Sequence, residues 1–180
     1  LGTGVGGGIV IDGKIYSGSN FAGAELGHMV IVKDGKECGC GRKGCWEKYA
    51  SATALVSQAV EAMEGNKSSL LWQTCDGDLN KVEGKTIFEA YDMGDAVAKA
   101  VVDKYLYYVA IGIANIVNAL QPEAVCVGGG ISGQGEKILQ PIRDIVKAER
   151  YSVYADKQAA IVPAALGNDA GIIGAALLDE

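Results

Sequence analysis

Basic side chains are few and scattered in this sequence of 180 residues. It has 16 Lys and Arg against 22 Asp and Glu, which gives a formal net charge of −6, and no cluster of Lys and Arg exceeds two residues. Proteins that bind nucleic acid cluster such residues, because they neutralise several phosphates at once. The sequence therefore argues against nucleic acid, and equally against an anionic membrane surface, as a partner.

Proline and long apolar runs are also scarce. Three prolines stand beside 26 glycines, and a glycine content about twice the ~7% average points to many special backbone turns. The longest uncharged stretch, 105–122, contains Asn115, Asn118 and Gln121. We therefore expect a buried helix there and not a membrane span.

No signal peptide is visible, and the chain begins at Leu1, without Met and inside an apparent loop motif. We therefore expect its true N-terminus to lie upstream. The length, together with 49% hydrophobic residues, predicts one domain or one lobe of a two-lobed protein and excludes general disorder. Free thiols among the five cysteines favour a reducing compartment, and we expect the cytoplasm.

The hydrophobic periodicity predicts an α/β fold in which three strands are followed by helices and then by strand–helix alternation. The two first strands flank the turn Asp12-Gly13. The expected later elements are a strand at 28–32, helices at 51–65, 87–93 and 95–120, a strand at 124–127, a helix at 136–149, a strand at 159–163 and a helix at 170–178. A hairpin followed by strand–helix alternation predicts a mixed sheet with helices packed on it.

The first chemical motif is the glycine-rich start of the chain, which contains G-x-G-x-x-G at Gly2, Gly4 and Gly7. It is not a dinucleotide fingerprint, because a strand and not a helix follows it at 9–11, and it lacks the lysine of a Walker loop. Its backbone N–H groups, with the hydroxyl of Thr3, suit phosphate oxygens. An ordinary tight turn is the alternative.

The second motif is H-x9-C-x-C-x4-C, formed by one imidazole and three thiols: His28, Cys38, Cys40 and Cys45. Four ligands of this type form a known closed zinc site, and the intervening glycines let a short loop fold around the metal. A redox pair of Cys38 and Cys40, or a histidine that merely belongs to the core, are the alternatives. Cys75 and Cys126 lie outside the motif, and we expect both to be buried or half-buried thiols.

Two carboxylates flank the zinc motif. If a metal fixes His28 and Cys45, it also positions Glu25 and Glu47, and carboxylates beside an imidazole accept hydrogen bonds from vicinal hydroxyls. Solvated surface acids are the alternative. A further motif is the short apolar strand 124–127 that ends in Gly128, Gly129 and Gly130, where a nucleotide base or ribose could lie against the backbone. A turn that leads into a helix would look the same.

Together, in this order and over essentially all 180 residues, these motifs resemble the nucleotide-binding half of the ROK family, in particular its bacterial glucokinases. Residues 166–174 resemble the family's closing turn and helix. The resemblance implies the actin-like ATPase fold of hexokinases, an α/β fold with two lobes around a cleft. This chain would then be the C-terminal lobe, residues 1–180, with a zinc loop at 28–45 inserted and the N-terminal lobe missing.

By that resemblance the reaction is transfer of the ATP γ-phosphoryl group to the 6-hydroxyl of glucose, with Mg²⁺ on the phosphates. The family roles carried over are phosphate binding by Gly2, Thr3 and Gly4, adenosine binding by Gly128–Gly130, sugar binding by Glu25, His28 and Glu47, and structural zinc binding by His28, Cys38, Cys40 and Cys45. His28 would serve metal and sugar through its two nitrogens. The family also favours a homodimer.

The chain departs from the family in what it does not contain. The family's catalytic base, an Asp after an Asn, and its first phosphate loop belong to the N-terminal half, and the first strand of this lobe lies upstream of Leu1. Asn168-Asp169 matches the C-terminal signature instead, so we expect Asp169 to cap the helix that follows. A sugar-sensing ROK repressor and a zinc-stabilised interaction module remain as alternative functions.

Overall fold

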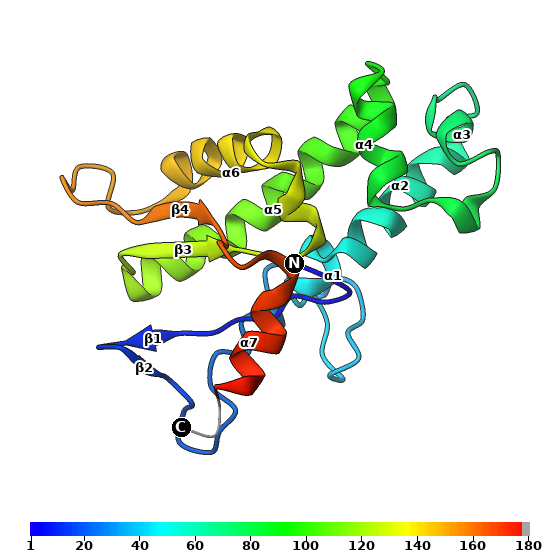
Figure 1. Cartoon of the computed structure of the whole chain (residues 1–180). Helices are drawn as coiled ribbons and strands as arrows, with labels where there is room; N and C mark the ends of the chain where they lie inside the picture. The colour runs from blue at the N-terminus through cyan, green and yellow to red at the C-terminus, as the bar shows by residue number, and fades with distance from the viewer. Residues whose placement is uncertain (178–180) are drawn as a thin grey trace.

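The structure is a computed structural model that describes residues 1–177 (Figure 1). Seven α-helices and four short strands are present among the described residues. The helices are α1 (Glu47–Ala50), α2 (Ala52–Gly65), α3 (Leu71–Thr74), α4 (Gly84–Asp92), α5 (Ala96–Leu120), α6 (Glu136–Glu149) and α7 (Ala170–Ala176). The strands are β1 (Val10–Ile11), β2 (Lys14–Ile15), β3 (Ala124–Val127) and β4 (Ala160–Pro163).

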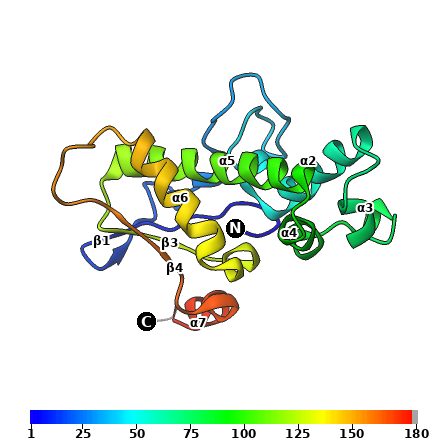
Figure 2. The same cartoon turned by 90° about the horizontal axis from the view of Figure 1, so that it is seen from above.

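Helix α5 is the centre of the protein. Twelve of its residues are buried, and α1, α2, α4 and α6 all pack against it (Figure 2). By length and composition α5 could also cross a membrane, but more than half of its most apolar window is buried inside the protein. The predicted buried helix is confirmed, and Asp95, whose side chain accepts a hydrogen bond from the N–H of Ala98, sets its start.

The strands pair in both parallel and antiparallel fashion, as the predicted mixed sheet requires, but they form two separate pairs. β1 and β2 are antiparallel around Asp12-Gly13, with Val10 opposite Ile15. β3 and β4 are parallel, with Val125 opposite Ile161, and α6 contacts β4 (Figure 1). No ladder joins the two pairs within residues 1–177. The parallel pair is the one on which a helix, α6, packs, and the described strands do not form one continuous sheet.

The predicted strand at 28–32 is wrong. Leu26–His28 forms a 3-10 helix instead, and only the isolated bridge between Val30 and Cys45 remains of the strand. The cause is the cysteine loop, residues 35–45. Both Ile31 N–H and Val32 N–H donate to the carbonyl of Gly44 in this loop, so the segment pairs with the loop and not with a strand. The predicted last helix is present as α7 up to Ala176, and its final residue, 178, lies outside the described residues.

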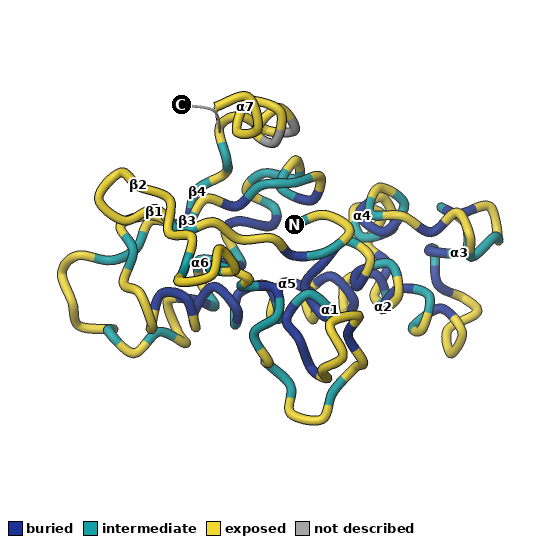
Figure 3. The backbone as a smooth tube through the Cα atoms, turned by 90° about the horizontal axis from the view of Figure 1, so that it is seen from below, coloured by how far each residue is buried: buried dark blue, intermediate teal, exposed yellow. Residues whose placement is uncertain are grey.

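A cavity of about 440 Å³ separates the two strand pairs. One wall is the glycine-rich segment 6–10, and the other is β3 with the end of α5. Large apolar side chains next to it are exposed, with Val10 at 67% and Ile11 at 53%, and the tube view shows both hairpin strands in the exposed class (Figure 3). Cys126 on β3 is exposed too, which corrects the expectation that it is buried or half-buried: β3 is paired on one edge only within the described residues. Cys75 is buried, as predicted.

Candidate functional site

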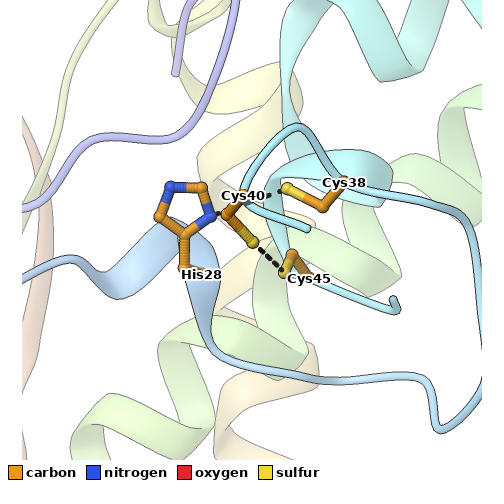
Figure 4. A group of neighbouring side chains, drawn as sticks. All are labelled: His28, Cys38, Cys40 and Cys45. Atoms are coloured by element: carbon orange, nitrogen blue, oxygen red, sulfur yellow. Dashed lines mark hydrogen bonds between the residues drawn. The ribbon is translucent and has the colours of Figure 1, made fainter. Parts of the chain in front are cut away.

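The four residues of the predicted zinc motif do converge (Figure 4). One ligand atom from each of His28, Cys38, Cys40 and Cys45 lies within 4.8 Å of all the others. The Sγ atoms of Cys40 and Cys45 are 3.6 Å apart, and Cys38 Sγ lies 3.6 Å from His28 Nδ1. These separations match the edges of a tetrahedron with metal bonds of about 2.0–2.3 Å. The donor set and its geometry therefore fit a tetrahedral zinc ion.

Backbone hydrogen bonds within the cysteine loop, residues 35–45, give it its shape. Cys38 N–H donates to Arg42 O, and Gly44 N–H donates to Lys36 O. Gly44 has φ +79°, and a Cβ there would collide with Val32 O, so the return of the loop requires glycine. The loop thus brings its three thiols to one side by a tight double turn.

The thiols of the loop titrate differently. The backbone N–H of Cys40 lowers the pKa of the Cys38 thiol, but burial and the hydrogen bond with Glu47 outweigh it and raise that pKa to about 12. The backbone N–H of Arg42, together with the charge of its side chain, holds the pKa of Cys40 below its ordinary value.

Glu47 connects the cysteine loop with the N-terminal glycine turn. Its Oε1 accepts a hydrogen bond from Cys38 Sγ at 3.1 Å and lies 3.8 Å from His28 Nδ1. On the other side, a Cβ added at Gly4 would lie only 2.7 Å from Glu47 Oε2. Gly4 therefore lets the predicted phosphate turn lie directly against the carboxylate that was predicted to bind sugar.

The residue before Glu47, Trp46, attaches this part of the chain to the core. The indole of Trp46, which is 4% exposed, donates to Tyr108 O on α5 at 2.8 Å. Gly112, one turn further along α5, leaves the space that the Trp46 ring fills. The sequence analysis missed α1, Trp46 and Gly112. The one local signal was glycine inside a long apolar helix, where it costs roughly 1 kcal/mol unless close packing requires it.

Glu25 directly precedes the 3-10 helix Leu26–His28. It is exposed, and its side chain forms no hydrogen bond or ion pair within residues 1–177. The backbone next to it has an unusual conformation: Ala24 has φ +63°. Non-glycine residues rarely adopt this conformation, and those that do cluster at binding sites. Gly27 packs against Val5 O. The segment with Glu25 and His28 is thus fixed against Val5, which directly follows the N-terminal turn.

The two predicted nucleotide motifs are neighbours. The N-terminal amine of Leu1 donates to Gly128 O at 2.7 Å. Gly129, at φ +94°, has no room for a Cβ because Leu1 lies against it, and Ser132 Oγ donates to Gly129 O. The turn at Gly2–Gly4 and the turn at Gly128–Gly130 therefore meet at Leu1, although more than 120 residues separate them in the chain.

The expected cap by Asp169 is wrong. Asp169 directly precedes α7, but its side chain makes no capping hydrogen bond. Its backbone, at φ −78° and ψ −12°, continues from the 3-10 helix Gly167–Asp169 into α7. A capping side chain needs the extended backbone of a true helix start, which this continuous turn does not offer.

The Gly2–Gly4 turn, the Glu47 carboxylate and the His/Cys cluster lie together in this structure, and comparison with known proteins shows which family the chain belongs to. The ROK family matches residues 1–180, and the chain belongs to that family. A glucokinase of Halalkalibacterium halodurans is 44% identical over 97% of this chain and 52% of its own length. A xylose repressor of Bacillus subtilis is 28% identical over 97% of this chain and 41% of its own length.

Solved structures give the same result. A ROK family glucokinase from Streptomyces griseus, in complex with glucose and AMPPNP, superposes with a TM-score of 0.90 at 39% identity, over 98% of this chain and 57% of that one. The predicted actin-like sugar kinase fold is thereby confirmed. The chain spans about half the length of the curated glucokinases that it matches.

Proposed function

We propose that this chain is the C-terminal lobe of a two-lobed ATP-dependent hexose kinase, with glucose as the favoured substrate and glucose 6-phosphate as the product. The observation that carries this proposal is the contact of three parts: the Gly2–Gly4 turn, the Glu47 carboxylate and the His28 cluster. The glucokinase from Streptomyces griseus resembles 98% of this chain, and its structure is a complex with glucose and AMPPNP.

In this proposal separate groups bind the nucleotide and the sugar. Gly2, Thr3 and Gly4 hold phosphate oxygens, and Gly128–Gly130 lie against the adenosine, which suits the contact of these two turns at Leu1. The carboxylates of Glu25 and Glu47 accept hydrogen bonds from sugar hydroxyls, and the imidazole of His28 donates or accepts one. Phosphoryl transfer depends on positioning and on charge stabilisation, and the Mg²⁺ that accompanies ATP supplies part of that charge stabilisation on the phosphates.

The zinc site that we propose is structural. His28 Nδ1, which lies beside Cys38, would hold the ion together with the thiolates of Cys38, Cys40 and Cys45. Nε2 of the same ring is then left for a sugar hydroxyl. Zinc bound in a closed set of four ligands stabilises the loop and takes no part in the transfer. Its effect on catalysis would come through the positions of His28 and Glu47.

Substitution of the two glutamates tests the sugar site in the full-length protein. Glu25→Gln and Glu47→Gln should each raise the KM for glucose by roughly 10- to 100-fold, because charge-assisted hydrogen bonds to hydroxyls are lost. The KM for ATP should change little. Glu37→Gln is the matched control, since Glu37 lies in the cysteine loop between these two glutamates and forms, within residues 1–177, an ion pair with Lys43 alone. Equal changes in both KM values would mean that the two glutamates merely support the fold.

The chain alone should not phosphorylate glucose, because it offers no convincing base for the proton of the attacking hydroxyl. Purified residues 1–180 are assayed with glucose, ATP and Mg²⁺, and then again with the N-terminal half supplied in cis or in trans. We expect turnover only in the second case. Turnover by the chain alone that Asp169→Asn abolishes without unfolding would overturn this division of roles.

A sugar-sensing repressor is the second candidate, because xylose repressors are similar to this chain over 97% of its length. Binding of AMPPNP by the full-length protein, measured by calorimetry, supports the kinase, whereas sugar binding without nucleotide binding supports the repressor. A zinc-stabilised module without catalysis predicts neither. We also propose, from the family resemblance and the free thiols, a cytoplasmic homodimer.

A further inference from the structure

We propose that Tyr49 is a positioning residue that holds the cysteine loop and Glu47 in register, through its hydroxyl, without contact to metal or sugar. This inference rests on the proposed zinc site. It assigns to one side chain the mechanical connection between the loop that would bind the metal and the helix that carries the sugar-binding carboxylate.

The hydroxyl of Tyr49 reaches the base of the cysteine loop. It accepts a hydrogen bond from the backbone N–H of Lys36 at 2.7 Å, and it lies so close to Gly35 that a Cβ there would collide with it. Lys36 O in turn accepts from Gly44 N–H at 2.8 Å. The outgoing arm of the loop at Lys36, two positions before Cys38, therefore meets the returning arm at Gly44, one position before Cys45, at the residue that Tyr49 fixes.

The rest of Tyr49 is attached to the core. The side chain is 6% exposed, and its ring packs on Tyr108 of α5 with a centroid separation of 4.9 Å. Its carbonyl accepts from Gln58 Nε2 at 3.1 Å. Tyr108 also receives the Trp46 indole on its backbone oxygen. The residues on both sides of Glu47 thus dock at the same position of α5.

This arrangement makes the loop and Glu47 depend on each other. α1 is only four residues long, and a helix of that length is not stable by itself. Without the Tyr49 hydroxyl the loop keeps its hydrogen bond between Gly44 and Lys36 and the contact of Cys38 with Glu47, but the base of the loop at Lys36 loses its hydrogen bond to α1. The loop would then have to be ordered when the metal binds, and metal affinity falls by the cost of that ordering.

Tyr49→Phe tests the role, because it keeps the ring on Tyr108 and removes only the acceptor. Zinc affinity of the purified protein is measured by competition with a chromogenic chelator. We expect Tyr49→Phe to weaken zinc binding by roughly 3- to 10-fold, the effect of one hydrogen bond. Tyr107→Phe is the matched control: Tyr107 is on α5, 46% exposed, and its hydroxyl has no hydrogen bond within residues 1–177.

Two further measurements separate positioning from general destabilisation. Ile138→Val, in the fully buried core of α6, should lower the unfolding midpoint but leave zinc affinity unchanged. In the full-length enzyme, Tyr49→Phe should raise the KM for glucose and not that for ATP. Unchanged zinc affinity in Tyr49→Phe, or an equal loss in Ile138→Val, would overturn the inference. A wild-type protein that binds no zinc would overturn the zinc site itself, and this inference with it.

Discussion

At the scale of single residues, glycine decides whether the candidate metal loop can close. Gly44→Ala combines a left-handed backbone at φ +79° with a collision against Val32 O, and the left-handed conformation alone costs an alanine about 1–2 kcal/mol. We expect Gly44→Ala to weaken zinc binding by about tenfold or more. The measurement is the metal content after gel filtration against a weak chelator.

Gly39→Ala is the control for that change. Gly39 lies in the same loop, but its φ is outside the left-handed region and a Cβ would have open space around it. Zinc content should therefore stay at the wild-type level. A similar loss in both variants would show that the loop is sensitive to any side chain and not to the closure at Gly44.

At the scale of elements, the start of α5 carries a buried carboxylate with a specific set of donors. Burial alone would raise the pKa of Asp95, but hydrogen bonds from Ala98 N–H, Leu70 N–H and Ser69 Oγ outweigh it and hold that pKa below its ordinary value. The stability gained from this shift is present above the unfolded pKa of about 3.9 and disappears as the pH falls through the lower, folded value.

Asp95→Asn therefore has a pH-dependent effect. It should lower the unfolding free energy by about 1–2 kcal/mol at pH 7, because one of the two acceptor oxygens becomes a donor. The difference from the wild type should shrink in urea unfolding at pH values below about 4. Asp103→Asn, an exposed residue of the same helix that pairs with Lys99, should change stability little at either pH. If the unfolding free energies of the wild type and Asp95→Asn differed by the same amount at all pH values, the lowered pKa of Asp95 would be contradicted.

At the scale of the whole molecule, the apolar cavity beside β3 predicts a further strand in the full-length protein. The Leu1 amine already bonds to Gly128 O, directly after β3, the resemblance to the ROK family implies a strand before this position, and the matched relatives are about twice as long. We expect Cys126 to react with iodoacetamide quickly in residues 1–180 and at least tenfold more slowly in the longer protein, since a paired edge shields it.

The reaction of Cys126 is read by peptide mass mapping. Buried Cys75 serves as the internal reference in both proteins, because it should stay unmodified in each as long as the fold is intact. Equal Cys126 rates in the two lengths would mean that the cavity beside β3 stays open, and the proposed division into two lobes would need a different boundary.

The sequence by itself determined which four ligand side chains come together in this protein. The spacing of His28, Cys38, Cys40 and Cys45 is local, and a short loop must bring such ligands together, so the cluster was predictable. Helix α5 was also predictable, because its period, its cap at Asp95 and the stop at Pro122 agree. Helix α6 was predictable from its period alone, since it has no side-chain cap and contains Pro141.

Only the tertiary structure decided how these parts meet. The strand expected at 28–32 gave way to pairing with Gly44, a long-range competition that no local pattern contains. The contact of Gly4 with Glu47 and the docking of Trp46 and Tyr49 at Tyr108 depend on residues far apart in the chain. Sequence patterns record which face of a segment is apolar, whereas the partner of that face is chosen by packing of the whole molecule.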